Sequence, residues 1–217
     1  MHSIKSNRLA LAGIMLASFV LLTWLYLGCT FSMHSAAPTA RTSVSSPARM
    51  VRYFPNTALI THENKKVRFY DDLVKGKVVV INLMYTKCED ICPITTWSLL
   101  QVQKALGNRI GRDVFLYSIT LDPDRDTPEV LKTYAENFGA KKGWYFLTGE
   151  FEDIERLRRK LGLYDPDPVI DVDKTQHGGL FIYGNEATGR WAAIPGFAKP
   201  QSIVKALLKV MTPVLDE

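Results

Sequence analysis

One apolar run near the middle of the chain most constrains the fold. Residues Lys77 to Met84 have the sequence KVVVINLM, without the polar alternation of a strand that faces water on one side. Such a run is typical of a strand buried on both faces, as in a parallel sheet covered by helices. A chain of 217 residues is long enough to bury a core of that kind.

Predicted strands and helices alternate from about Val51 onward. Helices are predicted where apolar residues recur at helical spacing, and strands where short apolar runs lie between turn residues. The predicted strands are 77–84, 114–121, 144–147 and a hairpin of 179–183 with 190–194; the predicted helices are 92–106, 128–138, 151–161 and 203–210. This order predicts an α/β sandwich around one central sheet.

Nineteen residues near the N-terminus, Leu9 to Leu27, carry no charge. Their number is close to the roughly 20 residues that cross a bilayer as a helix, so we predict a membrane anchor. The alternative is a cleaved signal peptide, with Ser35-Ala36-Ala37 as the cleavage site. The apolar stretch exceeds the roughly 7 to 15 residues of a typical signal sequence, which favours the anchor.

Basic residues around the apolar stretch predict its orientation. Lys5 and Arg8 precede it, and no basic residue follows it until Arg41. The positive-inside rule therefore places the N-terminus in the cytoplasm, with everything beyond Gly28 on the periplasmic side of the inner membrane. The predicted organisation is a cytoplasmic segment 1–8, a transmembrane helix 9–28, a flexible tether 29–50 rich in Ser, Ala, Thr and Pro, and a folded domain 51–217.

The distribution of charge argues against nucleic-acid binding. The chain has 27 basic and 22 acidic residues, and no run of five or more like charges. The basic residues at 141, 142, 156, 158, 159 and 160 lie among acidic ones such as those at 152, 153 and 155, which predicts a solvated face that can still dock a partner. The net charge of +5 is therefore no evidence for a nucleic-acid partner.

Three cysteines are too few for a disulfide framework, so each is interpreted by its surroundings. Cys29 directly follows the apolar stretch, which leaves a lipid attachment site or an inert thiol as its two interpretations. Cys88 and Cys92 lie between a predicted buried strand and a predicted helix. Their spacing of four places both sulfurs on one side of a helix, where they can reach one ion.

The position of Cys88 and Cys92 favours a reactive or metal-binding role over a structural disulfide. Free N–H groups at a helix N-terminus stabilise a thiolate, although Glu89 and Asp90 oppose this effect. Two thiolates suit soft metals, chiefly Cu(I) and then Zn(II). A structural disulfide is the alternative, but so short a loop would contribute little to stability. Metal binding and redox exchange remain open at this point.

Four histidines are available as a third ligand. His2 and His34 lie in the predicted cytoplasmic segment and tether, and His62 falls in the polar stretch THENKK, which we expect to be exposed. His177 differs because it precedes the predicted strand GLFIY. Sites gather at strand ends in α/β sheets, but a lone loop histidine is more often only solvated.

Several segments, taken in order, resemble the Sco family, which is also called SenC or PrrC. The similarity runs from about Val51 to the C-terminus, and the N-terminal anchor matches the usual architecture of that family. The matching segments are Thr86-x-Cys88-x-x-x-Cys92-Pro93, Asp122-Pro123-x-Arg125-Asp126-Thr127-Pro128-Glu129-Val130-Leu131, Phe146-Leu147-Thr148-Gly149 and the late His177.

The resemblance implies a thioredoxin-like fold, a central mixed sheet flanked by helices, in a membrane-tethered copper metallochaperone. By position, Cys88, Cys92 and His177 would be the copper ligands, and Asp122 would be an acidic residue near the site. The implied partner is the copper-receiving subunit of cytochrome c oxidase, whose copper centre such proteins help to assemble. A thiol reductant or another copper chaperone is a further expected partner.

Two features depart from the family pattern. Gln176 stands where the family usually has Asp before the histidine, and Gly178 and Gly179 stand where a Ser or Thr is common. Glu89, where a proline is frequent, adds negative charge between the cysteines, which is expected to offset part of the missing charge. A carboxylate beside a ligating histidine orients and tunes that ligand, so its absence is expected to weaken Cu(II) binding especially.

Two enzymatic hypotheses compete with copper delivery. In a thiol-disulfide oxidoreductase, one cysteine attacks a disulfide of a partner protein and the other resolves the mixed disulfide. This activity is compatible with copper delivery, because reducing a target and loading it with copper are successive steps. Peroxidase-like chemistry would need one activated cysteine, and the sequence singles out neither Cys88 nor Cys92.

Overall fold

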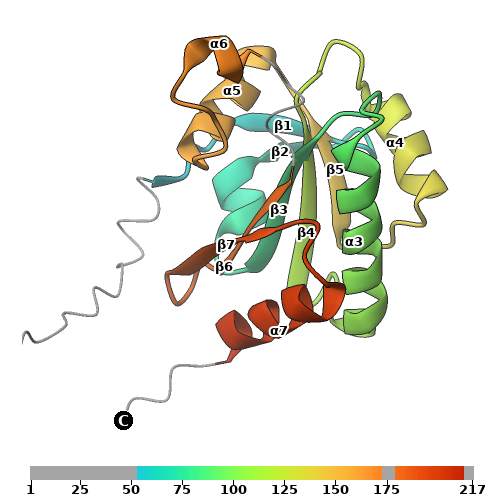
Figure 1. Cartoon of the computed structure of the whole chain (residues 1–217), viewed down its shortest axis with the longest axis vertical. Helices are drawn as coiled ribbons and strands as arrows, with labels where there is room; N and C mark the ends of the chain where they lie inside the picture. Colours follow the sequence, from blue (N-terminus) through green and yellow to red (C-terminus); the bar gives the residue numbers. More distant parts are fainter. Residues whose placement is uncertain (1–52, 173–178, 213–217) are drawn as a thin grey trace, which may run out of the picture. The chain divides into compact units, whose positions relative to one another are not determined.

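The computed structural model describes residues 53–172 and 179–212, which form one seven-stranded mixed sheet and the helices that cover it (Figure 1). The strand order is β2-β1-β5-β4-β3-β6-β7. The strands are β1 (Ala58–Thr61), β2 (Lys66–Arg68), β3 (Val78–Met84), β4 (Val114–Thr120), β5 (Trp144–Thr148), β6 (Leu180–Asn185) and β7 (Arg190–Pro195). The helical segments are η1 (Phe69–Val74), α3 (Ile91–Leu106), η2 (Gly107–Arg109), α4 (Pro128–Asn137), α5 (Phe151–Lys160), α6 (Pro168–Asp171) and α7 (Pro200–Met211).

The centre of the sheet is parallel and its margins are antiparallel. Strands β3, β4 and β5 pair in parallel, with Val80 opposite Leu116 and Leu116 opposite Trp144. Strands β1 and β6 then pair antiparallel with β5 and β3. All seven residues of β3 are buried, which confirms the prediction from the run KVVVINLM. The mixed sheet with flanking helices is likewise confirmed.

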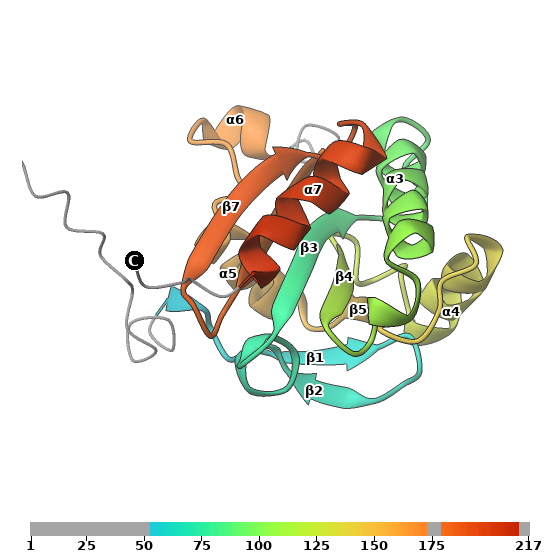
Figure 2. The same ribbon diagram turned by 90° about the horizontal axis from the view of Figure 1, so that it is seen from below.

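Alternate residues of β3 contact opposite helical layers. Val80 and Met84 lie in an apolar cluster with residues of α3, α4 and α7. Val79 and Ile81 lie in a second cluster with residues of η1 and α5. This period of two is the strand geometry that places successive side chains on opposite faces. Figure 2 shows α3 and α7 side by side over the first of these faces.

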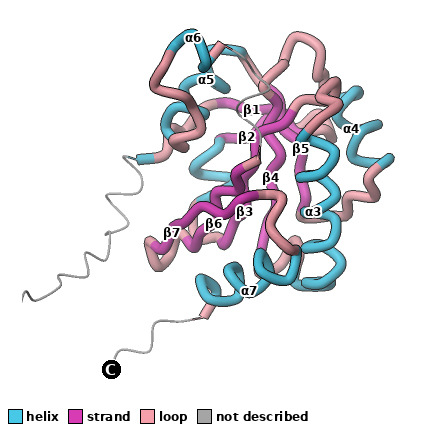
Figure 3. Tube along the Cα trace, viewed as in Figure 1, coloured by secondary structure: helices cyan, strands magenta, loops and turns pink. Residues whose placement is uncertain are grey.

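The sequence did not predict the sheet margin beside β5. Strands β1 and β2 have four and three residues, too few to show a period, and they form a hairpin (Figure 3). Its turn includes Asn64 in the left-handed region, with φ of 59°. His62 was expected to be exposed, but it is half-buried, and its Nδ1 accepts a hydrogen bond from the Phe146 N–H at 3.1 Å. The short helix α6 was also not predicted.

The N-terminal predictions fall outside the part of the chain that the structure describes. This holds for the transmembrane helix 9–28, the tether 29–50 and Cys29. Across residues 53–172 and 179–212, each helix is too short or too polar to cross a bilayer.

The prediction of a solvated basic face is wrong for Arg158. Its side chain is only 4% exposed, and its two terminal nitrogens each contact one oxygen of Asp171 at 2.7 Å. Glu155 accepts two further hydrogen bonds from the same guanidinium, and Asp171 also accepts one from the Asp165 N–H. A buried charge needs such partners, so this ion pair joins α5 to α6.

We expect Asp171→Asn to lower the free energy of unfolding by about 3 kcal/mol, because the amide removes the charge that faces the buried Arg158 and leaves one acceptor oxygen in place of two. Urea unfolding followed by circular dichroism measures this. The control is Asp153→Asn, which removes a more exposed contact with Arg156 and should cost about 0.5 kcal/mol. Equal losses of stability in the two variants would contradict the role of Asp171 as the partner of a buried Arg158.

Candidate metal centre

Cys88 and Cys92 lie where the central sheet meets its first long helix. Strand β3 ends at Met84 and α3 begins at Ile91, so Cys88 lies in the loop between them and Cys92 in the first turn of the helix. Both are at the carboxyl edge of the parallel strands. In α/β sheets this edge is where ligands bind. Pro93 fits in the first turn of α3, where the N–H groups have no partner within the helix.

The two cysteines are free thiols held close together. Cys88 is 6% exposed and Cys92 is 2% exposed. The Cys92 N–H points to the Cys88 sulfur at 3.4 Å. The N-cap residue Asp90 makes no side-chain cap, and the first turn of α3 contains no acidic residue. The Cys88 sulfur therefore takes the place of an N-cap acceptor at the positive end of the helix dipole.

The two thiols differ in acidity. Burial opposes ionisation of Cys88, but hydrogen bonds from the Cys92 side chain and from the N–H groups of Cys92 and Asp90 lower its pKa below the ordinary value. Burial, followed by the hydrogen bond to Cys88, raises the pKa of Cys92 to about 12. Cys88 is therefore the first of the pair to become a thiolate, and thiolate is the form that reacts or binds a metal.

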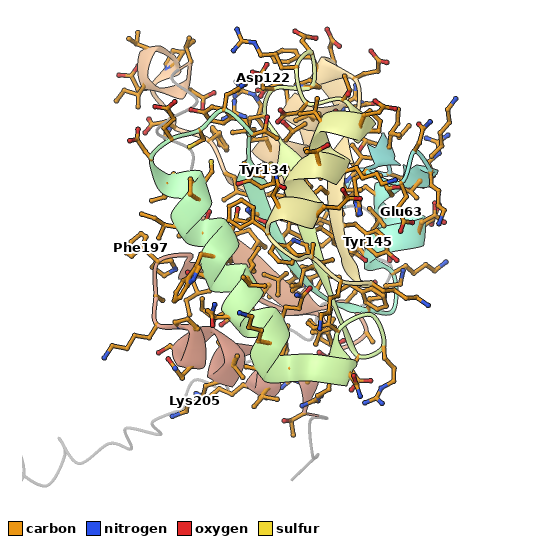
Figure 4. All side chains as sticks on the ribbon, turned by 90° about the vertical axis from the view of Figure 1, so that its right-hand side faces the viewer. Glu63, Asp122, Tyr134, Tyr145, Phe197 and Lys205 are labelled. Atoms are coloured by element: carbon orange, nitrogen blue, oxygen red, sulfur yellow. The ribbon has the colours of Figure 1, made fainter. Side chains whose placement is uncertain are left out.

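Two tyrosines that the sequence analysis did not select pack against the apolar cluster that contains both thiols. Burial and the neighbouring Cys88, to which its hydroxyl is hydrogen-bonded, raise the pKa of Tyr85 to about 12. Burial also raises the pKa of Tyr134 on α4 to about 12, and its hydroxyl lies 3.2 Å from that of Thr96 on α3 (Figure 4). Both phenols stay neutral at pH 7, so Tyr85 can stabilise a thiolate by donating a hydrogen bond.

Asp126 holds the loop that carries Cys88. The sequence analysis named Asp126 only as part of a segment that resembles the Sco family; in the structure it directly precedes Thr127, the N-cap of α4, and is 1% exposed. Its carboxylate accepts hydrogen bonds from the Thr86 N–H at 3.0 Å and from the hydroxyls of Thr86 and Thr120. It thus joins the loop after β3 to the end of β4. Two threonines at the ends of neighbouring parallel strands were the signal that could have revealed it.

Asp122, the acidic residue that the resemblance places near the site, lies in the turn that follows β4 (Figure 4). Its N–H donates to the Thr120 hydroxyl at 2.9 Å, and its carboxylate lies 3.7 Å from a terminal nitrogen of Arg125. Its backbone carbonyl accepts from the Asp126 N–H at 2.9 Å. The structure therefore shows Asp122 shaping the turn that brings Asp126 to Thr86.

His177 lies outside the described residues, so the structure does not place it. The described chain resumes at Gly179, whose φ of 122° favours glycine. A Cβ atom added there would lie 3.5 Å from Cδ1 of Ile91, the residue before Cys92. The chain two residues after His177 is thus beside the start of α3. Among residues 53–172 and 179–212, no three His, Cys, Asp or Glu side chains converge to hold a metal ion.

Comparison with known proteins defines the family. The SCO1/SenC family model matches residues 50–212, and the chain therefore belongs to the SCO1/SenC family. A putative copper-binding protein of Stutzerimonas stutzeri is 28% identical over 172 residues, which cover 76% of this chain and 78% of that protein. Protein sco1 of Schizosaccharomyces pombe is 31% identical over 143 residues, which cover 64% of this chain and only 53% of that protein.

Solved structures of Sco proteins share the fold. Copper-bound ScoI of Bradyrhizobium japonicum matches with a TM-score of 0.56 and 25% identity, over 70% of this chain and 96% of that one. Copper-bound yeast Sco1 matches with a TM-score of 0.57 and 25% identity, over 73% and 92%. BsSco, a Sco protein with a disulfide switch, matches with a TM-score of 0.59 and 25% identity, over 71% and 91%. The thioredoxin-like fold implied by the resemblance is confirmed.

We expect Asp126→Asn to lower the free energy of unfolding by about 2 kcal/mol, because an amide cannot accept all three of the hydrogen bonds that the carboxylate accepts. Thermal and urea unfolding measure the loss. Asp124→Asn is the matched control, since Asp124 is exposed in the same loop and should change stability by less than about 0.5 kcal/mol. A neutral Asp126→Asn would contradict the anchoring role.

Proposed function

We propose that the protein is a membrane-tethered copper metallochaperone that helps to assemble the copper centre of cytochrome c oxidase. The observation that carries the proposal is the pair of free, adjacent thiols at the N-terminus of α3. Membership of the SCO1/SenC family supports it, as do the copper-bound structures of other Sco proteins.

Copper would be held by Cys88, Cys92 and His177. Two sulfurs and a neutral imidazole suit Cu(I), which prefers soft ligands. Both thiols lose their protons on binding, so copper must displace the proton of Cys92 despite its raised pKa. Gly179 beside Ile91 supports His177 as the third ligand, because two extended residues reach no further than about 7 Å. Gln176 cannot supply the carboxylate that usually precedes this histidine in the family.

The proposed location is the inner membrane, with a single span at 9–28, a cytoplasmic N-terminus and the folded domain on the periplasmic side. The charge-free stretch from Leu9 to Leu27 and the preceding Lys5 and Arg8 support this arrangement. The proposed partners are the copper-receiving subunit of cytochrome c oxidase and a thiol reductant or second copper chaperone. BsSco, which shares the fold, is described as belonging to a family of cytochrome c oxidase assembly proteins.

An anaerobic Cu(I) titration of the reduced full-length chain against a competing chelator tests copper binding. We expect one copper per chain, and at least a tenfold loss of affinity in each of Cys88→Ala, Cys92→Ala and His177→Ala, because each variant removes one ligand.

His62→Gln is the control, because His62 is bonded to β5 and should leave the affinity within twofold of wild type. Unchanged copper stoichiometry in a chain lacking both Cys88 and Cys92 would refute the metallochaperone proposal. If the cysteine variants lost copper affinity and His177→Ala did not, His177 would not be a copper ligand.

A second candidate function is thiol-disulfide exchange, favoured by the unequal acidity of the free thiols. The Cys88 thiolate would attack a partner disulfide, and the partner's leaving sulfur would take up a proton. Cys92 would then lose its proton and attack the Cys88 sulfur, which releases the second partner thiol. The partner gains two electrons and two protons, and the pair Cys88–Cys92 becomes a disulfide.

Limited alkylation with iodoacetamide tests that order of reactivity. In a Cys29→Ser chain at pH 7, we expect Cys88 to react at least tenfold faster than Cys92, because its lowered pKa gives it the larger thiolate fraction. Mass spectrometry of tryptic peptides over time measures both rates. Equal rates, or faster labelling of Cys92, would contradict the exchange mechanism in this direction.

A further inference from the structure

An exposed apolar stripe on α3 starts beside the candidate metal centre. Ile94 and Trp97 are 53% and 52% exposed, although both are large apolar residues. They are three positions apart, and Gln101 and Ala105 continue the same helix face at spacings of four. Ile94 is two residues after Cys92, so the stripe starts within one turn of the cysteines, on the face of α3 that points away from the buried Cys92 side chain.

The stripe leads into a groove between α3 and α7. Trp97 and Ala105 form one wall, Val204 and Leu208 form the other, and the cavity volume is about 620 Å³. Leu208 is 39% exposed. Phe197, in the turn before α7, is 64% exposed, and its Cε1 lies 3.7 Å from the Cβ position of Gly179. Figure 4 shows Phe197 and Lys205 on the same side of α3.

The charged residues among those described as lining the groove, Lys104 and Lys205, are both basic, whereas the exposed Glu89 and Asp90 lie just before α3 at the other end of the stripe. Neither α3 nor α7 contains an Asp or a Glu. Lys104 and Lys205 flank the groove, and Lys104 also lines a second hollow with Lys141 and Lys142. An occupant with apolar residues facing the groove and carboxylates at its rim would therefore match this surface in both shape and charge.

We propose that this docking face, made of Ile94, Trp97, Phe197, Leu208, Lys104 and Lys205, binds an acidic amphipathic helix of the protein that exchanges copper with the cysteines. The inference rests on the proposed copper function, since it assigns a partner to the same site. A groove between two helices accepts the apolar face of a third.

The same observations disfavour two other occupants. A second copy docked by two-fold symmetry would bring the lysines of one groove against those of the other. A flat membrane surface would leave the groove between α3 and α7 unfilled. An acidic protein helix would fill the groove and would attract the lysines beside it.

The test is a binding titration of the full-length chain in detergent with the purified, copper-free soluble domain of the copper-receiving oxidase subunit. At low salt we expect both Lys104→Glu/Lys205→Glu and Trp97→Ser to weaken binding at least tenfold. Lys65→Glu/Lys66→Glu is the matched control, because it makes the same charge change at exposed positions near the β1–β2 turn. That pair should stay within twofold of wild type.

Copper titration of the same variants separates this inference from the function on which it rests. Unchanged copper affinity with weakened partner binding supports the docking face, whereas wild-type chain that binds no copper refutes the metallochaperone proposal instead. No binding by wild type, or equal binding by all variants, would overturn the docking face. A dimer of this chain that dissociates in Lys104→Glu/Lys205→Glu would also overturn it, because the occupant would then be a second copy. A membrane would be the occupant if the amides of α3 and α7 were protected from hydrogen exchange in phosphatidylglycerol nanodiscs without the partner, but not in phosphatidylcholine nanodiscs.

Discussion

The complete burial of β3 is the constraint on which the rest of this structure depends. A strand with seven buried residues needs apolar cover on both faces, which η1 and α5 supply on one side and α3, α4 and α7 on the other. Because β3 and β4 are parallel, the chain must cross over between them, and α3 is that crossover. The start of α3, and with it Cys92, is thereby fixed at the carboxyl edge of the sheet.

At this edge, the buried carboxylate of Asp126 and the N-terminus of α3 position the two thiols. Asp126 holds the loop after β3 through Thr86 and the end of β4 through Thr120. The N-terminus of α3 then offers its free N–H groups to the Cys88 sulfur rather than to a side-chain cap. The same elements that stabilise the junction therefore also separate the acidities of the two thiols. The stripe on α3 extends this site along the surface towards α7.

The sequence predicted the parts of the fold whose patterns are long and local. Strand β3 and helices α3 and α5 each carry enough residues to show a period, and their predicted limits differ from the observed ones by about one residue. Strands β1 and β2 are too short for that, and they depend on sheet pairing instead: β1 pairs with β5, and β2 pairs with β1. Arg158 was misjudged and the role of Asp126 was overlooked for one reason: burial of a charged residue depends on distant partners, Asp171 in one case and Thr86 in the other. The proximity of Cys88 and Cys92 was predicted, because their spacing is local.

X-ray absorption spectroscopy at the copper edge of the copper-loaded, full-length chain tests the central claim most directly. The account predicts a first shell of two sulfurs and one imidazole nitrogen, with the imidazole signal lost in His177→Ala and a sulfur lost in Cys88→Ser. A first shell of nitrogen and oxygen without sulfur would contradict the account, because copper would then be bound away from the thiols at the start of α3.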